Sequence, residues 1–117
     1  MQIKVQFIES GEYLTGFTVS GHDVSSADAE FSVLCAAVSS AVQLTCNTLT
    51  EYFGVPENAV RVHASRGMDN RISLRIPSVN RVQSDILRGL YLHMTVLSED
   101  TSGMLALKTV QRTDTHN

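Results

Sequence analysis

The chain of 117 residues contains no tryptophan, two prolines and two cysteines, and only 6% of its residues are aromatic. Its longest central apolar run, Val33 to Val38, is far shorter than the roughly 20 residues that a membrane-spanning helix needs. The segment 1–7 alternates apolar and polar residues, so it lacks the apolar block of a secretory signal. We therefore expect a cytoplasmic protein with neither kind of segment.

The two cysteines could form a disulfide, but their spacing opposes it. Cys35 and Cys46 fall within one predicted helix, eleven positions apart, which corresponds to about 16 Å along its axis. A disulfide needs Cα atoms within about 7 Å of each other. We expect two reduced thiols, which is typical of a reducing compartment.

No excess of positive charge is present, because the formal net charge is −3. This balance weighs against nucleic-acid binding as the main task. The sequence also has no zinc-ligand spacing, no phosphate loop and no Gly-x-Ser-x-Gly motif, and neither His63 nor His93 has a metal-binding spacing to the cysteines. We expect no metal, no cofactor, no membrane contact and no direct contact with nucleic acid.

What the sequence does contain is apolar periodicity, which predicts one α+β domain over residues 1–112 and a polar tail over 113–117. Alternation predicts strands over 2–9, 12–20, 60–65, 71–76 and 104–110, and a period of three to four residues predicts helices over 33–53 and 80–98. Ser32 is the expected N-cap of the first helix, and Asn80 with Gln83 resembles a capping box. The order β-β-α-β-β-α-β predicts two helices packed on a largely antiparallel sheet.

Three arginines occupy polar positions of the predicted hairpin: Arg61, Arg71 and Arg75. Alternation predicts that they share one face of the sheet. A solvated sheet face is the simpler interpretation. The alternative is a basic stripe that attracts an acidic or RNA-bound substrate.

The segment 21–39 contains the candidate chemistry. His22 follows the second predicted strand, and Cys35 lies in the first turn of the first predicted helix, after a polar loop over 21–31. A helix N-terminus favours the thiolate, and a nearby imidazole could act as its base. Gly21 permits a backbone turn that a side chain would hinder. A buried structural cysteine is the alternative interpretation of Cys35, and the pairing with His22 favours a catalytic dyad.

Gly21-His22, the loop, and Val-Leu-Cys-Ala-Ala-Val-Ser over 33–39 resemble the ribosomal-processing cysteine protease family, whose pattern is Gly-His-Ala, a loop, and Asp-x-Val-Cys-Ala-Ala-Val-Ser. The resemblance extends over nearly the whole chain. It implies a small α+β homodimer that removes the N-terminal extension of a large-subunit ribosomal protein (number twenty-seven). It also implies Cys35 as nucleophile and His22 as general base.

The sequence departs from that pattern at three places. Asp23 stands where the family has Ala, Ser32 stands where it has Asp, and the loop has an extra residue. A third group commonly orients the base, and Asp23, Asp28 or Glu30 could do so here. Ser39 lies one helical turn beyond Cys35, where it either supports the loop, contacts substrate or bonds its own backbone.

Two other classes of function remain open at this stage. A non-catalytic ribosome-assembly or peptide-binding module would bind peptide without turnover. A small thiol hydrolase acting on another acyl substrate would turn over thioesters or esters in preference to an extended peptide.

Overall fold

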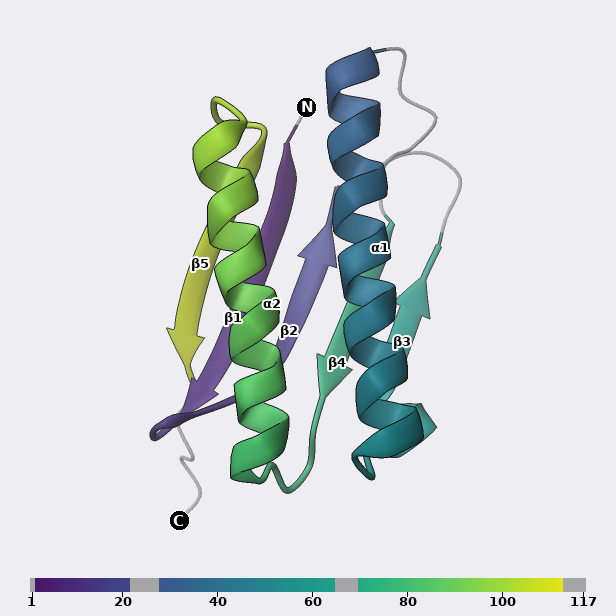
Figure 1. Ribbon diagram of the computed structural model, residues 1–117, viewed down its shortest axis with the longest axis vertical. Helices are drawn as coiled ribbons and strands as arrows, with labels where there is room; N and C mark the ends of the chain where they lie inside the picture. Colours follow the sequence, from purple (N-terminus) through teal and green to yellow (C-terminus); the bar gives the residue numbers. More distant parts are fainter. Residues whose placement is uncertain (1, 22–27, 65–69, 113–117) are drawn as a thin grey trace.

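Two helices cover one face of a five-stranded sheet in the computed structural model, which describes residues 2–21, 28–64 and 70–112 (Figure 1). The elements in chain order are β1 (Ile3–Ser10), β2 (Tyr13–Ser20), α1 (Ala29–Tyr52), a short 3-10 helix (Glu57–Ala59), β3 (Val60–His63), β4 (Arg71–Arg75), α2 (Arg81–Asp100) and β5 (Leu105–Gln111). The predicted α+β class and the order of strands and helices are confirmed. The expected tail over 113–117 lies outside the described residues.

The strands lie side by side in the order β3-β4-β2-β1-β5. β1 pairs antiparallel with β2, β2 with β4, and β3 with β4. β5 pairs parallel with β1, because α2 carries the chain across the sheet before β5 begins. The sheet is therefore largely antiparallel, as expected, with one parallel edge.

The core lies between the sheet and the two helices. Alternate residues of β1 point into it, and Phe7 meets Phe17 of β2 and the ring of Tyr91 of α2, with centroids 5.9 and 5.2 Å away. Residues spaced by three or four positions along each helix close the core from the other side: Leu34, Val38, Val42 and Leu49 of α1, and Leu87, Leu90 and Met94 of α2. The period-two and period-3.6 patterns in the sequence thus correspond to these two layers.

The helix α1 begins four residues earlier than the sequence predicts, and Ser32 is not its N-cap. The cap is Asp28, whose Oδ1 accepts a hydrogen bond from the Phe31 amide at 3.0 Å. The Ser32 amide donates to the Asp28 carbonyl oxygen at 2.9 Å. The expected start was wrong because Phe31, which is 2% exposed, extends the buried stripe by one turn.

With 24 residues, α1 is long and apolar enough to span a membrane by length and composition, and no other helix in the described part of the chain is. Eight of its residues, from Phe31 to Leu49, are buried within the fold. A helix at the centre of a globular core meets the same criterion, and α1 packs in that way here.

Hydrogen bonds at the start of α2 connect the two helices. The capping box expected at Asn80 and Gln83 is confirmed, with bonds of 2.8 and 3.0 Å between each side chain and the other residue's amide. Gln83 also donates from Nε2 to the Phe53 carbonyl oxygen at 2.7 Å. This bond joins the start of α2 to the C-cap of α1.

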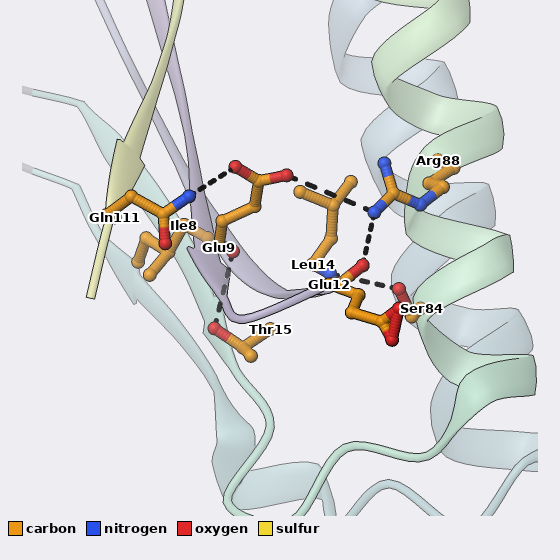
Figure 2. A network of polar contacts seen from close by, with 8 residues as sticks. All are labelled: Ile8, Glu9, Glu12, Leu14, Thr15, Ser84, Arg88 and Gln111. Carbon is orange, nitrogen blue, oxygen red and sulfur yellow. Dashed lines mark hydrogen bonds and ion pairs between the residues drawn. The ribbon is translucent and has the colours of Figure 1, made fainter. Parts of the chain in front are cut away.

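A polar network joins α2 to the β1–β2 hairpin where the pairing register shifts between Ile8 and Glu9 (Figure 2). Ser84 Oγ accepts a hydrogen bond from the buried Leu14 amide at 2.9 Å. Arg88 donates to the Glu12 carbonyl oxygen and forms an ion pair with Glu9 at 4.0 Å. The helix therefore satisfies a backbone donor that the shift leaves outside the strand ladder.

Ser84→Ala should lower the free energy of unfolding by about 1–3 kcal/mol, because the buried Leu14 amide would lose its acceptor. Urea unfolding followed by circular dichroism measures this change. Ser40→Ala, an exposed serine of α1, controls for the change in helix propensity. Equal stability of the two variants would contradict the role assigned to Ser84.

Candidate active site

Cys35 lies on the core side of α1 and is 0% exposed. Its neighbours on the same helix face, Phe31 and Val38, are also buried. Neither cysteine is in a disulfide, as the spacing predicts. In this conformation the Cys35 sulfur is closed to solvent and to any peptide outside the core.

Cys35 is not in the first turn of α1, as expected from the sequence, because the helix begins at Ala29. Cys35 is its seventh residue, and the dipole effect falls off within the first turn. The Phe31 and Ser32 amides are already bonded to Asp28, and the Ala29 and Glu30 amides lie about 8–9 Å along the axis from Cys35. The free amides of the helix N-terminus therefore do not lie beside the Cys35 sulfur in this conformation.

Cys46 is buried on the same helix and is 5% exposed. Burial raises the pKa of its thiol to about 11, because the thiolate would lose hydration. At neutral pH this thiol is protonated and unreactive. Cys46 is thus a core residue.

The proposed partner of Cys35, His22, and also Asp23 lie outside the described residues. Gly21 is described, and it adopts the backbone turn expected there, with φ +85°. A Cβ atom at Gly21 would lie 2.5 Å from the Gln2 carbonyl oxygen, and its amide donates to the Asn70 carbonyl oxygen at 3.3 Å. Conformation and close backbone approach both restrict this position to glycine.

A hollow of about 530 Å³ lies between α1 and the strands β2, β4 and β3. Its walls are largely apolar, and its lining residues are Val19, Val38, Ser39, Val42, Gln43, Val62, His63, Ala64, Asn70, Arg71 and Ile72. Ser39 is the expected site residue in this set, one turn beyond Cys35. Asn70 places the other end of the hollow beside Gly21. The structure thus brings together Ser39 and the strand end that precedes His22.

Two other expected site residues, Asp28 and Ser32, lie at the start of α1. Asp28 caps α1, and Ser32 is a half-buried residue of its first turn. Both lie on the segment between Gly21 and Cys35. In residues 2–21, 28–64 and 70–112, no group of three or more His, Cys, Asp or Glu side chains gathers as a metal ion would require.

Sequence reasoning missed His63, Asn70 and Arg71 as residues of the hollow. They belong to the β3–β4 hairpin, and they approach α1 because β4 pairs with β2. Local alternation predicts each strand but not which strands are neighbours. No signal in the sequence alone would have assigned these three residues to the hollow.

Residues 2–113 match the family model described as cysteine protease Prp. The chain belongs to the Prp family of cysteine proteases. The match extends over both helices and all five strands, so the Prp family assignment applies to the whole fold. No curated protein sequence matches the chain at a significant level.

Solved structures agree with the fold of this Prp family member. SMU.848 from Streptococcus mutans superposes with a TM-score of 0.80 at 18% identity, over 95% of this chain and 96% of that one. The S. aureus ribosomal processing protease Prp, solved with a substrate peptide, gives 0.75 at 13% identity, over 93% of this chain and 100% of that one. The same protease with a covalently linked product peptide gives 0.73 at 14% identity, with the same coverage.

Iodoacetamide should label Cys46 about 100-fold more slowly in the folded protein at neutral pH than in the unfolded chain, because the raised pKa lowers its thiolate fraction by about that factor. Peptide mass spectrometry after timed labelling measures the rate, and the same reaction in urea is the control. Labelling that is equally fast in both conditions would show that Cys46 is not buried as described.

Proposed function

We propose that this Prp family protease is a cytoplasmic endopeptidase that removes the N-terminal extension of a large-subunit ribosomal protein (number twenty-seven) during ribosome maturation. The observation that carries this proposal is the family match over residues 2–113. It is supported by the likeness to an S. aureus protein described as a ribosomal processing protease and solved with a substrate peptide. The resemblance of residues 21–39 to the family pattern supports Cys35 as nucleophile and His22 as base.

In the proposed reaction, His22 accepts the proton of the Cys35 thiol, and the sulfur attacks the scissile carbonyl carbon. The tetrahedral intermediate collapses, and His22 protonates the departing amine of the mature protein. Water, deprotonated by His22, then hydrolyses the thioester and releases the extension. No metal or cofactor takes part in these steps.

The burial of Cys35 adds a requirement to this reaction. Its sulfur is 0% exposed in the resting conformation, so the peptide must move the groups that cover it before attack. Assembly of the dyad on substrate binding follows from this requirement, since an apo geometry need not be the reactive one. Free enzyme should therefore show little reactivity at Cys35.

The hollow between α1 and the β3–β4 hairpin supports a location for the peptide. It presents apolar walls of Val38, Val42 and Val62 with the polar groups of Ser39 and Asn70 at its margin. Ser39 lies in it one turn beyond Cys35, so a chain bound there would pass close to the thiol. Asp28 Oδ1 caps the helix, and Asp23, Asp28 and Glu30 are the carboxylates proposed to orient His22.

A peptide that spans the extension junction of the cognate ribosomal protein tests the whole proposal. Wild type and Cys46→Ala should each give a single cut by mass spectrometry, and Cys35→Ser should give none while keeping its circular dichroism spectrum. Cleavage by Cys35→Ser would exclude that residue as nucleophile. Binding without cleavage by wild type would favour a non-catalytic module, and preferential ester hydrolysis would favour a small thiol hydrolase.

Val62→Glu should raise KM for that peptide about five- to tenfold with little change in kcat, because an apolar contact in the hollow would be lost. Val62 is 70% exposed, so the fold should tolerate the change. Leu92→Glu, at a 65% exposed position of α2 outside the hollow, is the matched control. Equal KM values for the two variants would place the peptide elsewhere.

The family resemblance also implies a homodimer, which we include in the proposal. Sedimentation equilibrium over a range of protein concentrations measures this state directly. A single species of monomer mass throughout would exclude it.

A further inference from the structure

The face of the sheet opposite the helices, here called the open face, carries five of the nine lysine and arginine residues of the chain. Strand alternation and pairing register assign the following cations to this face: Lys4 of β1, Arg61 of β3, Arg71 and Arg75 of β4, and Lys108 of β5. All five are exposed. At about 4.8 Å per strand, the face is roughly 19 Å wide from β3 to β5.

Four of these cations, Lys4, Arg61, Arg75 and Lys108, have no acidic neighbour on the open face within the described strands. Within the five strands of the described chain, the only acidic residue is Glu9, which pairs with Arg88 of α2 on the helix side (Figure 2). Among the described residues, no carboxylate forms an ion pair with Lys4, Arg61, Arg75 or Lys108. A protein with a net charge of −3 therefore segregates positive charge onto one flat surface.

Part of this surface is shaped as a polar hollow of about 500 Å³, lined by Asn58, Ala59, Arg61, Ser73, Arg75 and Pro77. Ser73 stands directly opposite Arg61, and Arg75 is the diagonal neighbour, about 7–8 Å from Arg61 between Cα atoms. Two guanidinium groups thus flank a hydroxyl and an amide, with no acidic residue in the lining. Guanidinium, hydroxyl and amide donors are the groups that bind phosphate oxygens in nucleic-acid complexes.

We propose that the open face binds the phosphate backbone of double-helical RNA without sequence preference. The other strand positions of the open face near these cations hold Ser, Thr, Gln, small or aliphatic residues and one ring, that of the exposed His63, which stands opposite Arg71. A single imidazole offers little stacking surface to a run of single-stranded bases, and no Phe, Tyr or Trp lies among these cations to anchor a protein partner. A wide flat set of donors fits the backbone of a duplex, which is recognised through phosphates and 2′-hydroxyls.

A second copy of the chain does not fit this face. A two-fold symmetric interface would bring the same patch of each copy together, and like charges would then oppose each other across it. The low net charge, which led to the expectation of no nucleic-acid contact, describes the whole chain and not this surface. The proposal does not rest on the proposed cleavage, since none of Lys4, Arg61, Arg75 and Lys108 lines the hollow next to α1.

Fluorescence anisotropy with a labelled RNA hairpin of mixed sequence, titrated with the full protein at several KCl concentrations, tests this binding. The logarithm of the binding constant should fall with the logarithm of salt concentration with a slope of about −3.6 to −4.5, as for four or five neutralised phosphates. The double variant Arg61→Gln/Arg75→Gln should bind about tenfold more weakly and lose roughly two units of slope. Its peptide cleavage should equal that of wild type.

Arg81→Glu is the matched control, because it changes the net charge by the same −2 on the helix side of the molecule. It should leave RNA binding unchanged, and Lys4→Gln/Lys108→Gln should weaken binding as the arginine pair does. If Arg81→Glu weakened RNA binding as much as the arginine double variant does, net charge alone would explain the effect, and the proposal would be overturned. Absence of hairpin binding by wild type would also overturn the proposal. If polyglutamate competed with the labelled hairpin as well as unlabelled hairpin does, the result would overturn it too and would indicate an acidic protein partner.

Discussion

The packing of the apolar stripe of α1 over the sheet is the constraint on which the rest of the structure depends. Phe31, Leu34, Cys35 and Val38 share this stripe, and removing each side chain from water contributes on the order of 1–3 kcal/mol. The Asp28 cap fixes where the stripe begins. Cys35 is thus one of the residues that hold the helix in place, so the proposed cleavage requires a local rearrangement of the core around it.

The sequence was sufficient for the features that depend on local pattern. Alternation located all five strands, the 3.6 period located both helices, and Asn80 with Gln83 identified the start of α2. It placed the start of α1 wrongly, because Ser32 and Asp28 are both good caps and only the burial of Phe31 decides between them. The pairing of β4 with β2, and with it the hollow, depends on contacts between distant segments that periodicity does not encode. The pairing of His22 with Cys35 remains a prediction.

The net charge of the chain and the distribution of charge on its surface lead to different expectations about nucleic-acid binding. A net charge of −3 does not reveal that five cations gather on the open face, while the described strands contain a single acidic residue, Glu9. Alternation predicted that Arg61, Arg71 and Arg75 share a face, and the register confirms this and adds Lys4 and Lys108 from the far side of the sheet. The two hollows are also separate, one largely apolar beside α1 and one polar on the opposite face. The fold can therefore offer two independent surfaces.

The strand order also leaves β3 and β5 with one unpaired side each, at opposite edges of the sheet. Exposed edges recruit further strands and so promote aggregation, and lysine or arginine on an edge opposes this. β3 is only four residues long and carries Arg61, and β5 carries Lys108. Arg61 and Lys108 therefore oppose the pairing of these edges with strands of other molecules. Replacing either cation by an apolar residue would favour aggregation.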